Sequence, residues 1–261
     1  PSSELALVQE YPPIPFSNLR SLKRTIEAKL HSIEEGDENV HISVNNVTAA
    51  DLDSIEKYRD RNRPSLRLTF FDDISTLIIK CPSKMHDKAC GNLGSAIFVK
   101  LTGMGVSDYN EFYSLLSGRH ETPSWRKEGD GAWKNLDLRP SDDAWPHLVI
   151  EAGLAESLPR LRVDAKWWIE NSKGEVQIVL IIQIKKQARR VLIEKYIPTK
   201  PSSGPMTRSR TAGRRIITQR VSEISIDHST NPPVVQGAPL VLEFQRVIGR
   251  APQPPERDIV V

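Results

Sequence analysis

The sequence predicts an α/β fold in which a mixed β-sheet carries helices on its faces. Helical and strand patterns alternate along the chain, with helices at 83–101 and 157–171 and a continuous strand at 176–184. Such alternation is typical of a sheet covered by helices. The length of 261 residues suffices for one large domain or two small ones, and a hydrophobic share of 38% indicates a core with sizeable loops.

The expected helices follow from apolar residues that recur every three or four positions. This spacing is present at 18–35, at 83–101 and at 157–171. A shorter helix is expected at 51–59, and Thr48 is its candidate N-cap. Each of the three long helices therefore has one face to bury.

The expected strands are short runs rich in β-branched residues, and turn residues bound them. A hairpin is predicted from 66–71 and 76–80. The other predicted strands are 131–138, 148–152, 176–184, its antiparallel partner 190–196, and two closing strands at 216–226 and 240–244.

One segment departs from this pattern. Residues 198–215 are rich in Pro, Ser and Arg, which is typical of a mobile insertion. The net charge is +3, and basic residues cluster at 185–190 and at 208–220. These clusters indicate a nucleic-acid partner, although a solvated strand edge and a flexible loop would have the same composition.

The two cysteines, Cys81 and Cys90, are too few for a disulfide framework, and no His/Cys cluster has zinc spacing. No apolar run reaches the ~18 residues of a membrane span, and no secretory signal is visible. We therefore expect an intracellular protein, nuclear or cytoplasmic, without a membrane partner.

Two acidic residues are the candidates for chemistry. Glu151 follows the apolar run 148–150, and a carboxylate in such a setting is costly to bury unless it is paired or binds a cation. Asp130 lies upstream between Gly129 and Gly131, and on a neighbouring strand it would complete a divalent metal site of the kind that cuts phosphodiesters. The alternatives are a tight-turn residue for Asp130 and a strand-end cap for Glu151.

Several segments in a fixed order carry a family resemblance. They are IKCPSKMHD at 79–87, EGD at 128–130 with RP at 139–140, WPHLVIEAG at 145–153, LRVDAKWW at 161–168, and GAPL at 237–240 with the strand that follows it. Together they resemble the PD-(D/E)XK nuclease superfamily, and more closely a fungal group of restriction-endonuclease-like proteins. The resemblance covers about 64–261 and leaves 1–63 as a partly helical N-terminal extension.

The resemblance implies a restriction-endonuclease-like fold and Mg²⁺- or Mn²⁺-dependent hydrolysis of DNA or RNA. It implies that Asp130 and Glu151 are catalytic metal ligands, with Asp87 at the edge of the metal site. The superfamily lysine is replaced by Gly153, so the basic catalytic residue is expected on the following helix, at Arg162 or Lys166.

Three classes of function stay open. The first is a metal-dependent nuclease, and the second is a catalytically inactive nuclease-fold domain that binds nucleic acid or a protein partner, which Gly153 favours. The third is an effector- or toxin-type module, which rests on fold analogy alone. A nuclease needs Asp130, Glu151 and one cationic group near a common point, whereas an inactive domain would leave that point closed.

Overall fold

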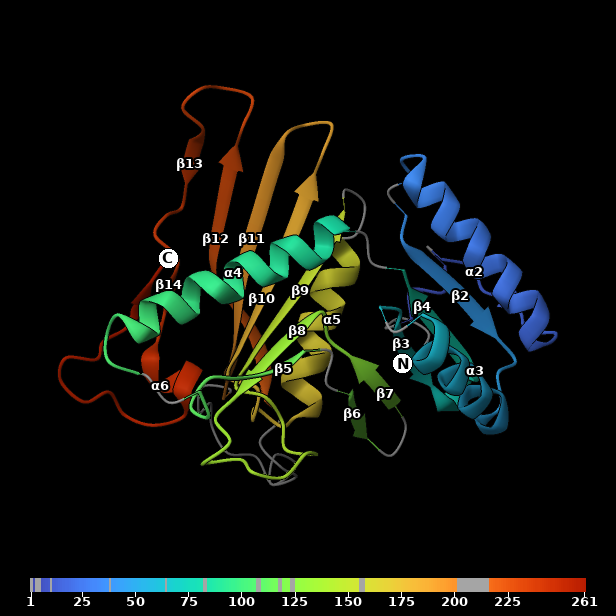
Figure 1. Ribbon diagram of the computed structural model, residues 1–261, viewed down its shortest axis with the longest axis horizontal. Coiled ribbons are helices and arrows are strands. Elements are labelled where there is room, and N and C mark those ends of the chain that lie inside the picture. Colours follow the sequence, from blue (N-terminus) through green and yellow to red (C-terminus); the bar gives the residue numbers. More distant parts are fainter. Residues whose placement is uncertain are drawn as a thin grey trace, which may run out of the picture. The chain divides into compact units, whose positions relative to one another are not determined.

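The protein is described by a computed structural model (Figure 1). The described residues are 2, 6–9, 11–37, 39–63, 65–81, 84–106, 109–116, 119–122, 125–154, 158–200 and 216–261. They form two compact units, of which the first comprises Pro1–Asp87 with Ser117–Gly129 and the second Lys88–Leu116 with Asp130–Val261. This division differs from the expected boundary after residue 63, because the hairpin that follows residue 63 pairs with strands of the first unit.

The first unit is a six-stranded sheet with two helices. The strand order is β1-β2-β4-β3-β7-β6. The strands are β1 (Ile14–Pro15), β2 (His41–Asn45), β3 (Arg67–Phe71), β4 (Thr76–Lys80), β6 (Arg119–Thr122) and β7 (Trp125–Glu128), and the 3-10 turn η1 (Asp72–Ile74) joins β3 to β4. The predicted hairpin is thus confirmed, and residues 1–63 contribute strands as well as helices.

The two helices of the first unit begin close to where the sequence predicts. Asn18 caps α2 (Leu19–Glu34), and Thr48 caps α3 (Ala49–Asn62) through a capping box with Asp51. Apolar residues from both helices and from β2, β3 and β4 form one buried cluster. The helix expected at 51–59 therefore exists, and it is longer at both ends.

The second unit is built on a seven-stranded mixed sheet, with strand order β13-β12-β11-β10-β9-β8-β5. Its strands are β5 (Tyr113–Leu116), β8 (Gly131–Lys134), β9 (Leu148–Leu154), β10 (Ile178–Lys185), β11 (Arg190–Thr199), β12 (Ile217–Asp227) and β13 (Val234–Gln236). Two short strands, β14 (Val241–Leu242) and β15 (Ile259–Val260), pair separately. The expected α/β fold with a mixed sheet is confirmed.

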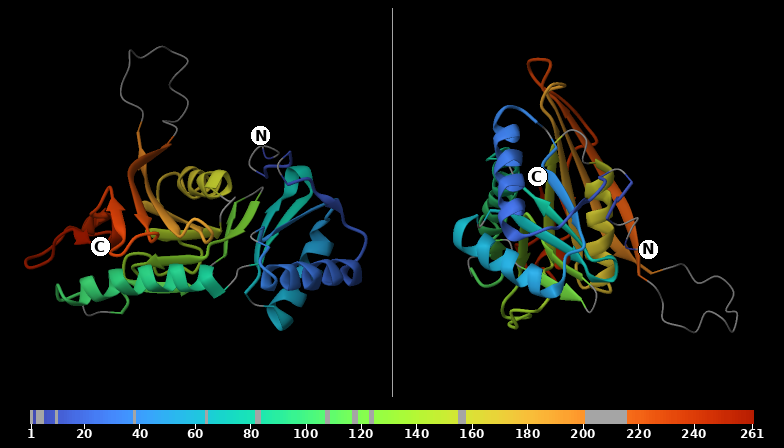
Figure 2. Two further views of the ribbon diagram at one scale, coloured as in Figure 1. Left: turned by 90° about the horizontal axis from the view of Figure 1, so that it is seen from above. Right: turned by 90° about the vertical axis from the view of Figure 1, so that its right-hand side faces the viewer.

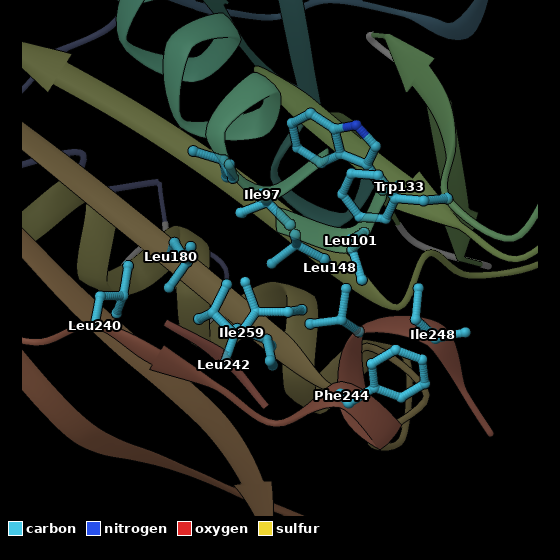
Figure 3. Close-up of a cluster of buried hydrophobic side chains, with 14 of the residues drawn as sticks. Ile97, Leu101, Trp133, Leu148, Leu180, Leu240, Leu242, Phe244, Ile248 and Ile259 are labelled. Atoms are coloured by element: carbon cyan, nitrogen blue, oxygen red, sulfur yellow. The ribbon is translucent and has the colours of Figure 1, made fainter. Parts of the chain in front are cut away.

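Helices cover both faces of this sheet (Figure 2). On one face, Ile97 and Leu101 of α4 (Lys84–Thr102) share a core with Leu148 and Ile150 of β9 (Figure 3). On the other face, α5 (Leu158–Asn171) contacts β9, β10, β11 and β12, and it connects the parallel pair β9 and β10. Because side chains alternate along a strand, Glu151 of β9 points to the α5 face.

Two predicted strands are corrected. The strand expected at 131–138 ends at Lys134, because the Asn135 side chain accepts hydrogen bonds from the amides of Asp137 and Leu138 and forms a turn. The strand expected at 240–244 stops at Leu242, and Phe244 begins the short helix α6 (Phe244–Ile248).

The predicted mobile insertion at 198–215 falls mostly outside the described residues, since 201–215 are not among them. Pro198 and Thr199 belong to β11 and pair with Thr218 and Ile217 of β12. In the described part of the chain, no helix combines the length and apolar character that a bilayer crossing requires.

Candidate functional site

Asp130 and Glu151 lie at the same end of the β8–β9 ladder. The antiparallel ladder between β8 and β9 ends at the pair Gly131 and Ile150. Asp130 is the residue directly before β8, and Glu151 is the residue of β9 directly after Ile150. The two acidic residues that the sequence singles out therefore come from adjoining segments of the second unit.

The Asp130 carboxylate replaces a backbone carbonyl as the hydrogen-bond acceptor for β9. Its Oδ2 accepts a hydrogen bond of 2.8 Å from the Ala152 N–H, a group that a longer β8 would have bound through a carbonyl. Asp130 thereby sets the end of β8 and is itself held against the residue that follows Glu151. Gly131 is required by packing, because a Cβ there would lie 2.8 Å from the Trp133 ring.

Glu151 is 1% exposed and belongs to the α5 face of the sheet. Its Oε1 accepts a hydrogen bond of 2.7 Å from Nε1 of Trp168, a fully buried residue of α5. Hydrogen bonds of this kind offset part of the cost of burying a carboxylate. The indole holds the Glu151 side chain in one direction and ties β9 to α5.

The two basic candidates of α5 do not share the face of Trp168. Lys166 is exposed and lies about 200° around the helix from Trp168, since each residue turns an α-helix by about 100°. Arg162 is also exposed, and its guanidinium is bound to Glu194 of β11, with Nη2 at 2.6 Å from Oε1 and Nε at 3.1 Å from Oε2. The structure therefore places Arg162 at a different carboxylate from the one expected.

The basic residue on the buried face of α5 is Arg160. It is 4% exposed, and its Nη2 lies 3.2 Å from Oδ1 of Asp164, which is also buried. Arg160, Asp164 and Trp168 recur every fourth residue, so they share one side of the helix. The spacing of four residues is visible in the sequence, but the sequence does not show which side of α5 faces the sheet, so Arg160 was not predicted as a site residue.

Another buried polar residue of the second sheet is Gln183 of β10. It is 2% exposed and is the register partner of Gly153, the glycine at the motif lysine position.

Asp87, the third candidate metal ligand, belongs to a different unit from the other two. It is exposed in the first turn of α4 and belongs to the first unit, while Asp130 and Glu151 belong to the second.

The donor set at Asp130 and Glu151 fits a hard divalent cation in kind. Carboxylate oxygens are the ligands that Mg²⁺ and Mn²⁺ prefer. In the described part of the chain, no three His, Cys, Asp or Glu side chains gather in one metal-binding group. Two protein carboxylates, with water or substrate oxygens at the remaining positions, are a usual arrangement for Mg²⁺.

A second buried carboxylate, Glu194, forms a charge cluster on the same face. Besides Arg162, it accepts hydrogen bonds from Arg220 at 2.6 Å and from the Tyr196 hydroxyl at 2.5 Å. Burial by itself raises the pKa of Glu194, but the bonds from the arginines and the tyrosine outweigh it and lower the pKa to about 2. Burial and the neighbouring Glu194 raise the pKa of Tyr196 above its usual range. The cluster joins α5 to β11 and β12.

Comparison of the chain with protein-family models gave no match, and comparison with curated proteins gave none. The resemblance to the nuclease superfamily therefore rests on the sequence motifs alone.

Proposed function

We propose that this chain is a metal-dependent phosphodiesterase of the nuclease type, with DNA or RNA as its substrate. The observation that carries the proposal is the position of Asp130, which lies at the end of the β8–β9 ladder and accepts a hydrogen bond from the N–H of Ala152, the residue after Glu151. A mixed sheet with helices on both faces is also the fold that the family resemblance implies.

In this proposal Asp130 and Glu151 hold one Mg²⁺ or Mn²⁺ ion. When bound, the ion polarises the phosphate and lowers the pKa of a bound water. The Ala152 N–H and the Trp168 indole keep the two carboxylates in fixed directions. Arg160 takes the place of the missing motif lysine, because it is the basic residue of α5 on the Trp168 face.

A second candidate is an inactive nuclease-fold domain that binds nucleic acid or a protein partner. The observation that favours it is the burial of Glu151, which is 1% exposed, together with the commitment of Arg162 to Glu194. In that case the Asp130 and Glu151 carboxylates only stabilise the junction of β8, β9 and α5.

A cleavage assay separates the two candidates. Purified protein is incubated with single- and double-stranded DNA and RNA in the presence of Mg²⁺, Mn²⁺ or EDTA. The proposal predicts metal-dependent cleavage that drops at least a hundredfold in Glu151→Gln and in Asp130→Asn, since both remove a metal ligand. The matched control is Asp137→Asn, which changes an exposed carboxylate of the same unit.

Binding of nucleic acid without cleavage under any metal condition would replace the nuclease by the inactive domain. Cleavage that persists at full rate in both ligand variants would exclude these residues as the active site. Arg160→Gln adds a further check, because the proposal expects slower cleavage with retained metal binding.

A further inference from the structure

A separate cavity lies where β9 and β10 begin, at the opposite end of β9 from Gly153. Its volume is about 540 Å³, within the range of small-molecule sites. The polar side chains that line it come from the loop after β8, from the starts of β9 and β10, and from the segment around α6, all within the second unit. They are Arg139, His147, Gln177, Glu243, Gln245 and Arg246, with Gly249 beside them.

Arg139 supplies one positive charge to the cavity. Its Nη1 donates to the carbonyls of Trp145 and Pro146 at 2.6 and 3.2 Å, and its Nη2 donates to the carbonyl of Glu175 at 3.1 Å. These acceptors are neutral, and burial lowers the pKa of Arg139 below its usual range. The guanidinium is thus fixed in position while its charge is not cancelled by a bonded carboxylate.

Arg246 of α6 supplies a second positive charge. Its Nη1 donates to Oε1 of Gln177 at 3.0 Å. Across the described ranges, neither Arg246 nor Arg139 forms a salt bridge. The carboxylate at the rim, Glu243, is paired with Lys195 at 2.7 Å, so the charge of the lining stays positive.

His147 adds a neutral hydrogen-bond donor. It is 3% exposed, and burial together with nearby Arg139 lowers its pKa to about 3, so the imidazole is neutral at pH 7. Its Nδ1 accepts a hydrogen bond of 3.4 Å from the backbone N–H of Asn135, which assigns the ring proton to Nε2.

Gly249 keeps the Nε2 side of that ring open. A Cβ at this position would lie 2.4 Å from His147 Nε2, and the φ of +88° is one that only glycine adopts readily. A side chain there would close the cavity at its imidazole.

We propose that this cavity binds a small phosphomonoester, with Arg139, Arg246 and the Nε2–H of His147 as donors to the phosphate. Two arginines and a neutral N–H suit a dianion with several acceptor oxygens. The volume exceeds that of a bare phosphate group, so the cavity has room for an organic part such as a sugar. This site is distinct from Asp130 and Glu151.

Calorimetric titration tests the proposal. Ribose 5-phosphate and a nucleoside 5′-monophosphate are titrated into the full chain, with inorganic phosphate, citrate and unphosphorylated ribose as comparison ligands. We expect saturable binding of the phosphomonoesters and at least tenfold weaker binding of the other three. EDTA or Glu151→Gln should leave the affinity unchanged, which separates this site from the proposed metal site.

Arg246→Gln should weaken phosphomonoester binding at least tenfold, because the Arg246 side chain bonds only Gln177 within the described chain. Arg257→Gln is the matched control, since it removes the same charge from an exposed position outside the lining. Equal affinities in these two variants would overturn the proposal, as would the absence of saturable binding. Tighter binding of citrate or inorganic phosphate would overturn the assignment to a phosphomonoester.

Discussion

Two glutamates on one face of the same sheet have different surroundings. Glu151 and Glu194 are both fully or nearly fully buried, and each is the register partner of Ile181 of β10, from opposite sides. Glu194 accepts from two arginines and a tyrosine, whereas Oε1 of Glu151 accepts from a neutral indole.

The comparison shows that two carboxylates buried to a similar degree in one sheet can have different hydrogen-bond partners. The charge of Glu194 is compensated by guanidinium groups, and its low pKa keeps it ionised at any physiological pH. Glu194 therefore stabilises the packing of α5 against β11 and β12. Glu151 accepts from the Trp168 indole and lies at the same end of the β8–β9 ladder as Asp130, so under the proposed function an added divalent cation would stabilise the two carboxylates.

The largest effect is expected from removing both arginines of Glu194. The double variant Arg162→Met and Arg220→Met should lower the free energy of unfolding by about 3 kcal/mol at pH 7, because a buried charge loses its partners. This value is at the lower end for buried pairs, since both guanidinium side chains are 45% exposed. Urea denaturation measures it.

The same variant has a defined pH dependence. The pKa of Glu194 is about 2 in the folded chain and about 4.3 in the unfolded one, so its stabilising contribution is complete above pH ~4.3 and is lost as the pH falls through ~2. The stability difference between the parent and the double variant should therefore shrink below pH ~4.3. A difference that stays constant down to pH 2 would contradict the ion-pair account.

A smaller loss is expected at Glu151. Trp168→Phe removes the indole N–H and should cost about 1–3 kcal/mol, because a buried acceptor loses a donor. Trp167→Phe is the matched control in the adjacent residue. Saturating Mn²⁺ should recover part of the loss in Trp168→Phe alone, and thermal melting with and without metal tests this.

Metal binding itself should stabilise the parent modestly. At ten times the dissociation constant, Mg²⁺ or Mn²⁺ should add about 1.4 kcal/mol by mass action. The gain should vanish in Asp130→Asn and Glu151→Gln and persist in Asp137→Asn. Without metal, the first two variants should melt at or above the parent temperature, since one of two adjacent negative charges is removed. An equal metal response in all variants would place the ion elsewhere.

The smallest effect is expected at Lys166. Lys166→Ala should change the free energy of unfolding by less than about 0.5 kcal/mol, because the side chain is exposed and turned away from the Trp168 face. Cleavage, where present, should also be unchanged. A large loss of cleavage activity in a variant that folds normally would instead show that Lys166 contributes to the site.

Local signals were enough to predict many elements of this protein. The capping box of α3 joins Thr48 to Asp51, three residues apart, so the sequence alone contains both partners. The hairpin of β3 and β4 and the strand pair β10 and β11 also follow from runs separated by short turns. The carboxylates Asp130 and Glu151 stood out because one sits between glycines and the other beside an apolar run.

The partners of Glu194 could not be predicted in this way. Arg162 lies 32 residues before it and Arg220 lies 26 residues after it, on a helix and a strand that only the folded sheet brings together. The assignment of Arg162 and Lys166 to the site failed to account for which side of α5 packs on β9 and β10.

The sequence by itself determined the α/β class and several of its helices and strands, and it singled out the two carboxylates, because periodicity, caps and turns act over a few residues. It did not predict β2, β5, β6 or β7. Only the tertiary structure decided that Asp130 reaches the Ala152 amide, that Arg160 is the buried cation of α5 and that Arg162 belongs to Glu194. These outcomes depend on strand register and on the rotation of a helix about its axis, which are set by packing between segments far apart in the chain.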